Sequence, residues 1–499
     1  MMKFEEYIQY DALGLAELVQ SKQIQASELL EIAINRAEKV NPKINAIITP
    51  MYDRARNKAN SMPSGIFSGV PFLAKDLFQE YAGVPASCGS NAYIRQQYTP
   101  KENSEIVNRW ENAGVLSFGL TNTPELGIKG VTEPVAWGAC KNPWHLKHNS
   151  GGSSGGSASA VAAGITPIAG ANDGGGSIRI PASYCGLFGL KPSRGRTPWG
   201  PNRSELMHGA ATQHVLTKSV RDSAAMLDVI HGFETSSLFR LPDPEQSYLE
   251  LIQRPPQPLK IAYSTVSPVG TKVSKDAINA IKQTVKLLES LGHQVVEDQP
   301  NINGTQLAKD FVTTWFSQCA HNLYQTKLDL GKGIRDSDFE LDTRVIAAFG
   351  ANTSAVDYIH NLQNWGKYVT ATNHFFNRYD LYLVPSTATV APKNGEVATP
   401  SWQKPILKTL LTLGKADWLA QGALMEQLIK DNLKWVPFTQ LANITGLPAM
   451  SVPLYWNKHN LPLGSQFIAP FAREDRLLQL AHQLEMAQPW MPNYQNIVV

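Results

Sequence analysis

The sequence predicts an α/β protein with a largely parallel or mixed β-sheet. Short apolar stretches with strand-like patterns alternate with amphipathic stretches of helical period along the 499 residues. Such alternation is typical of α/β folds. No internal repeat or long linker interrupts it. A single domain over residues 1–499 is therefore the simplest organisation, although the length alone would allow two to four domains.

The composition is that of a globular enzyme. Hydrophobic residues make up 43% of the chain and charged residues 17%, which excludes a disordered or collagen-like chain. The formal net charge of +3 is nearly balanced, and the chain has no dense run of Lys and Arg. We therefore expect no nucleic-acid partner and no anionic membrane surface as partner. No stretch is apolar over the roughly 18 residues that a membrane span needs.

The first third of the chain predicts alternating helices and strands. Residues 26–42 have a helical apolar period, with Ser27 as the expected N-cap and Pro42 just past the end. Residues 69–78 alternate with period two, which predicts a strand with Phe72 on one side and Lys75 on the other. The other elements expected here are a strand at 44–50, a helix at 102–114, a strand at 115–120, a small-residue helix around 153–164 and an apolar segment at 165–170.

The second half predicts a βαβ-like unit. It consists of a strand at 259–264, a helix at 276–292 that ends at a glycine, and a strand at 293–298. A buried strand at 380–386 and a late helix at 476–487 are also expected.

The cysteines and histidines predict no metal or disulfide chemistry. Cys88, Cys140 and Cys185, like the fourth cysteine in the helical segment at 309–323, have no CxxC or metal-ligand spacing. His145 and His148 have HxxH spacing, but no third ligand is apparent. The first residues lack the charged and apolar regions of a signal peptide, so the cytoplasm is the expected location.

Two segments rich in glycine and serine point to chemistry. The first, at 149–160, contains a G-x-S-x-G pattern around Ser153, but polar residues precede it where a nucleophile elbow needs an apolar strand. No GK[ST] follows the glycines, which argues against a phosphate-binding loop. Taken alone, this segment is equally consistent with a flexible loop.

The second segment, "NDGGGSIRIP", favours an oxyanion hole. Three glycines precede Ser177, and polyglycine is costly to order. Backbone N–H groups without Cβ atoms beside them can approach a substrate oxygen closely, and each such donor is typically worth about 3 kcal/mol. No histidine lies between His148 and His208, so the base that would activate Ser177 is not a neighbouring imidazole.

The motifs together resemble the amidase signature family of serine hydrolases. They are "GVPFLAKD", "GGSSGGS", "GGGSIRIPA", "CGLFGLKPSRGR", "FTQLANITGLPAMSVPL" and "LPLGSQFIAPFAREDRLLQLAHQLE". The resemblance covers nearly the whole chain. It is densest over about 68–200, and about 258–499 forms the C-terminal part of the same domain. The resemblance implies a large mixed central sheet flanked by helices on both faces.

The resemblance also implies the catalytic residues. Ser177 matches the nucleophile, Ser153 the bridging serine whose peptide bond is cis in the family, and Lys75 the base. A lysine has a pKa of about 10.4 in water, and burial lowers it because the charged form loses its hydration. The apolar pattern before Lys75 makes such burial plausible. No metal and no organic cofactor is required.

Further site residues follow from the same match. The N–H groups of Gly174, Gly175, Gly176 and Ser177 would form the oxyanion hole. Ser154 would be a supporting hydroxyl, and Asp173 and Arg179 match supporting structural positions. Many family members have threonine or isoleucine in place of Gly174, a departure that loosens the loop.

Trp315 and Cys319 form a candidate substrate wall. They lie four residues apart in "KDFVTTWFSQCAHNL" and would share one face of a helix. This pattern is consistent with ordinary core packing. It is also consistent with one wall of the acyl pocket, because the family varies its substrate site in this region.

The expected function is hydrolysis of a small or medium carboxamide through an acyl-enzyme. "TNTPELG" and "VTEPVAWGACKNPWHL" look most like the branch that hydrolyses aminohexanoate cyclic dimers, so a cyclic or linear aliphatic amide is the expected substrate. Two alternatives stay open: the glutaminase subunit of a tRNA-dependent amidotransferase, which usually has glutamine in place of Ile180, and an inactive ligand-binding homologue. The sequence also leaves a homodimer open.

Overall fold

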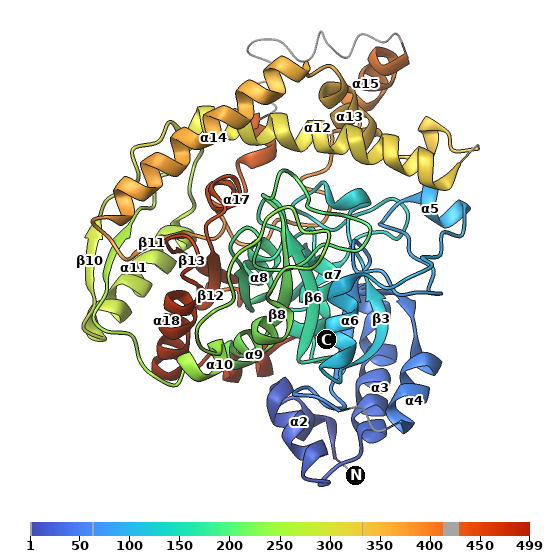
Figure 1. Cartoon of the computed structure of the whole chain (residues 1–499), viewed down its shortest axis with the longest axis vertical. Helices are drawn as coiled ribbons and strands as arrows, with labels where there is room; N and C mark the ends of the chain where they lie inside the picture. The colour runs from blue at the N-terminus through green and yellow to red at the C-terminus, as the bar shows by residue number, and fades with distance from the viewer. Residues whose placement is uncertain (1, 62–63, 332, 413–428) are drawn as a thin grey trace.

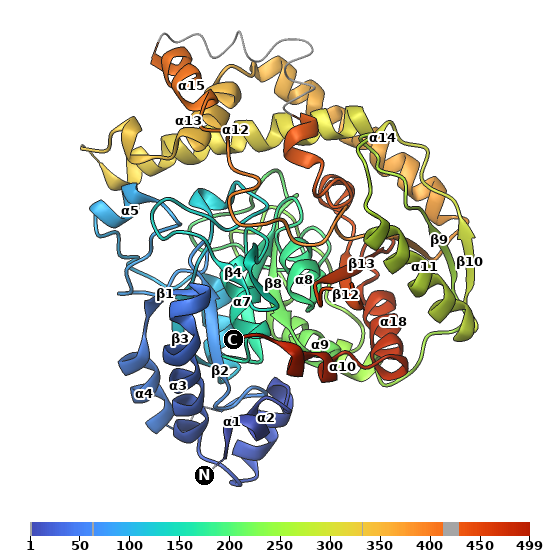
Figure 2. The same cartoon turned by 180° about the vertical axis from the view of Figure 1, so that it is seen from behind.

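A mixed sheet of eleven strands forms the centre of the protein (Figures 1 and 2). The computed structural model describes residues 2–61, 64–331, 333–412 and 429–499. The strands lie in the order β1-β3-β2-β6-β8-β7-β12-β13-β11-β9-β10, and β4 and β5 form a separate ribbon. The pairs β2–β3, β2–β6, β9–β10 and β9–β11 are parallel, and the other pairs are antiparallel. The predicted α/β class with a large mixed sheet flanked by helices is confirmed.

The strands are β1 (Ile47–Pro50), β2 (Pro71–Lys75), β3 (Leu116–Thr121), β4 (Lys141–Asn142), β5 (His145–Asn149), β6 (Ile168–Asp173), β7 (Phe188–Lys191), β8 (Thr212–Thr217), β9 (Lys260–Tyr263), β10 (Gln294–Glu297), β11 (Leu381–Pro385), β12 (Ala449–Trp456) and β13 (Pro462–Ile468). Strands from both halves of the chain share the one large sheet. The single domain over residues 1–499 stays a prediction.

The α-helices are α1 (Phe4–Tyr7), α2 (Ala12–Gln20), α3 (Ala26–Ile44), α4 (Tyr52–Asn60), α5 (Asn91–Arg95), α6 (Glu105–Asn112), α7 (Gly155–Ala162), α8 (Arg179–Cys185), α9 (Val220–Ile230), α10 (Tyr248–Leu251), α11 (Lys275–Ser290), α12 (Gly304–Leu330), α13 (Leu341–Ala351), α14 (Ala355–Phe376), α15 (Gln403–Thr412), α17 (Gln440–Thr445) and α18 (Glu474–Ala487). Within the described residues, no helix has the length and apolar character needed to cross a membrane.

The N-terminal helix α3 differs from the expectation at both ends. It begins at Ala26, with Gln25 rather than Ser27 as N-cap, and it continues through Pro42 to Ile44. Proline in the last turn removes only one backbone hydrogen bond, so the helix can pass it. Asn45 then ends the helix in the left-handed conformation, with its N–H donating to the carbonyl of residue 41.

The βαβ-like unit of the second half is confirmed. Strands β9 and β10 pair in parallel, with Lys260 opposite Gln294, and α11 connects them. The hydroxyl of Ser274 accepts a hydrogen bond from the N–H of Ala277 and so caps this helix.

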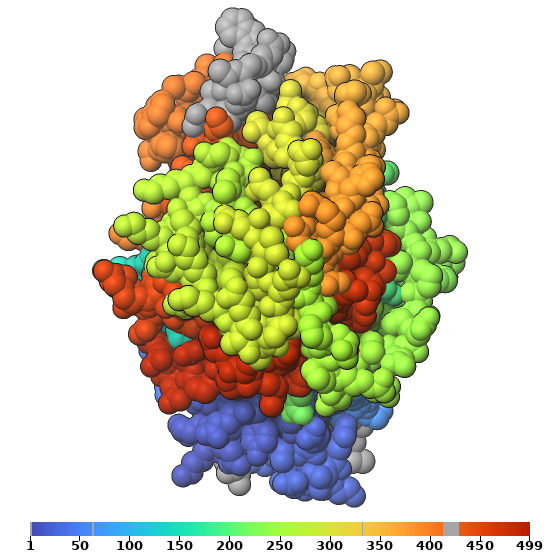
Figure 3. All heavy atoms as spheres, turned by 90° about the vertical axis from the view of Figure 1, so that its left-hand side faces the viewer, coloured from blue at the N-terminus to red at the C-terminus, as the bar shows by residue number. Residues whose placement is uncertain are grey.

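A layer of helices crosses one end of the sheet, and the sequence predicted it only in part. Figure 1 shows α12 and α14 running across this end with α13 and α15 beyond them, opposite the N-terminal helices. Figure 3 shows the same separation from the side, with the N-terminal residues at the bottom. Helix α12 of this layer lines the cavity described below.

All residues of strand β2 are buried. The parallel strands β3 and β6 pair with its two edges, and helices α3 and α7 pack against it. Phe72 in this strand packs against Trp110 of α6, with ring centroids 4.8 Å apart, and both side chains are fully buried.

We expect Phe72→Ala to cost about 3–5 kcal/mol of folding free energy because it leaves a cavity against Trp110. The measurement is the midpoint of chemical unfolding. Val356→Ala on α14, where the side chain is 77% exposed, should leave the midpoint nearly unchanged. Equal midpoints for the two variants would contradict this description of the core.

Candidate active site

Two neighbouring parallel strands bring the predicted catalytic residues together. Lys75 is the last residue of β2, and the segment 174–177 follows the end of β6. These strands pair in parallel, with Phe72 opposite Ile168, so their carboxyl ends meet at the same edge. Ligand sites in such sheets lie outside the carboxyl ends of the strands.

The amine of Lys75 is fully buried between two neutral groups. Its Nζ lies 2.6 Å from Oγ of Ser153 and 2.6 Å from Oδ1 of Asn172. Burial holds the pKa of Lys75 well below its usual value, against the opposing effect of the negative charge on Asp173. Burial therefore favours the neutral form of this amine.

Asn172 and Gln79 position this lysine, and neither was predicted from the sequence. Asn172 donates from Nδ2 to the carbonyl oxygen of Leu77 at 2.9 Å, which orients its Oδ1 toward the amine. Oε1 of Gln79 accepts a hydrogen bond from the backbone N–H of Lys75 at 2.7 Å and so holds the backbone from which this side chain extends. Asn172 adjoins the glycine motif in sequence, but only the pairing of β2 with β6 places its amide beside Lys75.

The two serine segments lie against each other. The Gly152–Ser153 peptide bond is cis, as the resemblance predicts. The N–H of Ser154 donates to the carbonyl oxygen of Ser177 at 3.3 Å, and the Ser154 hydroxyl contacts the backbone of Asn172 at 3.4 Å. Ser153 and Ser177 line the same cavity.

Glycines are required where these segments pack closely. A Cβ at Gly152 would come within 2.7 Å of the Lys129 carbonyl oxygen. A Cβ at Gly175 would lie 2.5 Å from the Phe311 ring. At Gly174 it would lie 2.9 Å from the Met207 sulfur, near the end of that side chain, and 3.5 Å from the Ala211 Cβ. The glycine run therefore allows α12 to approach the backbone before Ser177.

The four N–H groups expected to form an oxyanion hole are not equivalent. The Gly176 N–H donates to Oδ1 of Asp173 at 2.7 Å. Because it is already hydrogen-bonded, Gly176 is not one of the oxyanion donors, contrary to the expectation from the sequence. Across the described parts of the chain, the N–H groups of Gly174, Gly175 and Ser177 donate to no protein acceptor. These three residues are partly exposed, whereas Gly176 is buried.

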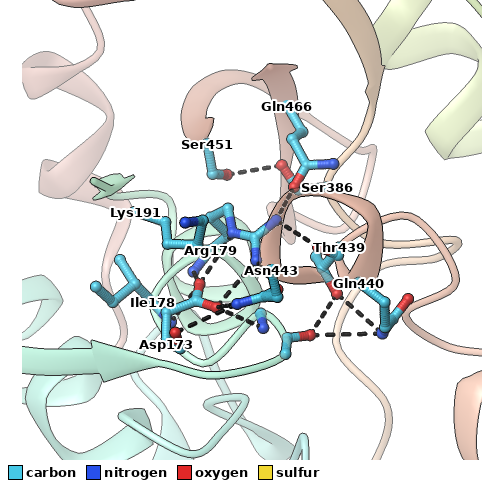
Figure 4. Close-up of polar contacts among 12 residues, drawn as sticks. Asp173, Ile178, Arg179, Lys191, Ser386, Thr439, Gln440, Asn443, Ser451 and Gln466 are labelled. Atoms are coloured by element: carbon cyan, nitrogen blue, oxygen red, sulfur yellow. Dashed lines mark hydrogen bonds and ion pairs between the residues drawn. The ribbon is translucent and has the colours of Figure 1, made fainter. Parts of the chain in front are cut away.

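A buried ion pair holds this loop (Figure 4). Arg179 donates from Nε to Oδ2 of Asp173 and from a terminal nitrogen to Oδ1, both at 2.9 Å. Its remaining N–H groups reach the Thr439 carbonyl, Gln466 and Asn443. Burial alone would raise the pKa of Asp173, but Arg179 holds it well below its usual value. Two of the three predicted supporting residues, Asp173 and Arg179, are thus part of one polar network.

The cavity beside the serines has a volume of about 110 Å³ and is lined in part by α12. Trp315 and Cys319 line it, together with Phe311. The Cys319 side chain is 1% exposed, and burial raises the pKa of its thiol well above the usual value, so a nucleophilic thiolate is not favoured there.

The rings of His145 and His148 lie 4.8 Å apart, edge to face. Within the described ranges, no group of three or more His, Cys, Asp or Glu residues is arranged to hold a metal ion.

The sequence and the fold are similar to those of known amidases. The Amidase family profile matches residues 28–478. The chain is 34% identical over 490 residues to a 6-aminohexanoate-cyclic-dimer hydrolase of Pseudomonas sp. (strain NK87), covering 96% of this chain and 95% of the relative. It is 35% identical to a lipoamidase of Enterococcus faecalis over 96% of this chain and 63% of the relative.

Solved structures agree with this assignment. A 6-aminohexanoate cyclic dimer hydrolase complexed with substrate superposes with a TM-score of 0.87 at 33% identity, covering 97% of this chain and 98% of the other. A bacterial aryl acylamidase of the amidase signature family superposes with a TM-score of 0.85 at 26% identity, over 98% of each chain. The chain therefore belongs to the amidase signature family of amide-hydrolysing enzymes.

Proposed function

We propose that this amidase cleaves its substrate through a Ser177–Ser153–Lys75 relay and a covalent acyl-enzyme. The observation that supports it most directly is the buried Lys75 amine, 2.6 Å from the hydroxyl of Ser153, which lines the same cavity as Ser177. A neutral amine in this place can accept the proton that Ser153 releases.

In the proposed acylation step, Ser177 Oγ attacks the amide carbonyl carbon and forms a C–O bond. The Ser177 proton passes to the Ser153 oxygen as the Ser153 proton passes to Lys75 Nζ. The relay then runs in reverse and protonates the leaving nitrogen as the C–N bond breaks, because an unprotonated amide anion is a poor leaving group. Water attacks the ester by the same route and releases the carboxylate.

Three N–H groups would stabilise the oxyanion of the tetrahedral intermediate. We assign this role to Gly174, Gly175 and Ser177, which line the cavity and whose N–H groups have no acceptor among the residues that the structure describes. Asp173 and Arg179 fix the loop that carries these three N–H groups. Ser154 supports the same loop, because its N–H donates to the Ser177 carbonyl oxygen and its hydroxyl contacts the Asn172 backbone.

For the substrate we propose a cyclic or linear aliphatic amide. The relatives at 34% and 35% identity include a cyclic-dimer hydrolase and a lipoamidase.

The glutaminase alternative is supported by the fold alone, since the amidotransferase subunit from Thermotoga maritima is 23% identical. We also expect cytoplasmic location and no resident cofactor, and a homodimer stays a prediction.

We expect Ser177→Ala to lose at least roughly 10⁴-fold in kcat because it removes the nucleophile. The assay is carboxylate release from a cyclic and a linear aliphatic amide, together with labelling by a fluorophosphonate probe. Ser290→Ala, an exposed serine at the end of α11, is the matched control and should behave as the wild type. A Ser177→Ala protein that is still labelled and active would exclude Ser177 as nucleophile, and an unlabelled, inactive wild type would favour a ligand-binding homologue.

The activity should depend on the protonation of Lys75. Because burial lowers its pKa, kcat/KM should rise with pH through a value below that of free lysine and then level off. Lys75→Ala should lose this rise and most of the acylation. Lys75→Arg keeps a positive charge that never deprotonates, so it should be equally inactive if the role is that of a base. Rescue by arginine in a correctly folded variant would point to a purely structural charge instead.

Neighbouring glycines should differ in their tolerance of a side chain. Gly175→Ala places a methyl group against the Phe311 ring and displaces a proposed oxyanion donor, so we expect kcat to fall by roughly 10²–10³. Gly174→Ala meets the movable Met207 side chain, with the Ala211 Cβ at 3.5 Å, and should cost much less. Steady-state kinetics of the two variants provide the test. Equal losses would argue against this assignment of the loop.

A further inference from the structure

A second cavity adjoins the catalytic one beside α13 and α15. Its volume is about 330 Å³, compared with about 110 Å³ for the catalytic cavity. Neither Ser153 nor Ser177 lines it. Figure 2 shows α15 beside α13 at the end of the molecule where the helical layer lies. The two cavities share lining residues, among them Trp315 and Val436, and therefore lie side by side.

The wall of the second cavity is apolar. Phe316, Val345, Phe349, Ile406 and Trp435 lie on it and come from α12, α13, α15 and the segment before α17. At its outer rim Ile406 is 53% exposed, so the apolar surface continues to solvent on this side. A surface of this kind favours the apolar part of a ligand.

The charged groups on this wall satisfy one another. Lys129 and Asp342 are the charged side chains on its described lining, and Lys129 Nζ lies 2.7 Å from Asp342 Oδ2. The hydroxyl of Thr399 donates to the other oxygen of Asp342 at 2.7 Å. Because both charges have partners, the described lining of this cavity offers no unpaired charge with which to bind an ionic group.

The boundary between the two cavities contains a glycine. Gly130 lines both of them. A Cβ at Gly130 would come no closer than 3.8 Å to Ile180 and 3.9 Å to Val436. Unlike Gly152 or Gly175, this glycine is not required by close packing. Its missing side chain leaves space between the catalytic serines and the apolar cavity.

We propose that the second cavity binds an aliphatic chain attached to the scissile amide, and that Gly130 keeps the passage to it open. This inference rests on the proposed function, since the chain enters only when its amide lies at Ser177. Each methylene group transferred from water into an apolar site should improve kcat/KM roughly fourfold. The enzyme would therefore select amides by chain length.

The test is a series of linear amides with one leaving group and acyl chains from acetyl to decanoyl, and a parallel series of N-alkyl acetamides. In one series, kcat/KM of the wild type should rise with each methylene group and then level off. That series identifies which side of the amide occupies the cavity. Flat profiles in both series, with the acetyl amide still hydrolysed, would overturn this proposal and leave the proposed function intact.

Two variants close the passage from different sides. Gly130→Leu fills the boundary, and Val345→Trp fills the second cavity from α13 without lining the catalytic one. Each should lower the ratio of kcat/KM for long over short amides by roughly tenfold or more. Gly366→Leu on α14 is the matched control, because a Cβ there would meet nothing within 4 Å. An unchanged ratio in both test variants would overturn the proposal.

Binding without turnover separates this proposal from the chemistry. In a Ser177→Ala background, calorimetry should show alkyl amides binding more tightly as the chain lengthens, and Gly130→Leu should remove this gain. Affinity independent of chain length would overturn the proposal, even if the wild type hydrolysed no amide and the proposed function had failed.

Discussion

The site depends on one constraint: a lysine amine buried without a counter-ion. Lys75 lies between the neutral groups of Ser153 and Asn172, where a charged ammonium would be poorly compensated. Asp173 is the carboxylate whose charge opposes this effect, and it is engaged by Arg179 through two hydrogen bonds. The ion pair therefore holds the loop before Ser177 and also limits how far Asp173 can stabilise a proton on Lys75.

The rest of the fold makes this arrangement rigid. Lys75 ends a strand that is buried on both faces, and Asn172 lies on the adjacent parallel strand, so backbone pairing fixes their separation. Each serine segment leads directly into a helix: α7 follows Ser153 and Ser154, and α8 follows Ser177. Catalytic groups placed by a sheet in this way need little reorganisation during the reaction.

The helical layer has a different role from the sheet. Helix α12 contacts the glycine loop through Phe311 and lines the catalytic cavity, while α13 and α15 line the apolar cavity beside it. In the proposed function, the chemistry resides on the sheet edge and substrate choice on the helical layer. Changes in α13 or α15 would then alter which amide enters without moving the proposed catalytic groups.

Strand and helix periodicity predicted the fold class, because these are local signals, and the motifs that resemble the amidase signature family supplied Lys75, Ser153 and Ser177 as candidate catalytic residues. The sequence by itself did not reveal Asn172 as the neighbour of Lys75, or that Gly176 donates to its own loop. The second cavity was equally hidden. These features arise from the pairing of β2 with β6 and from helices far apart in the chain, so only the tertiary structure decided them.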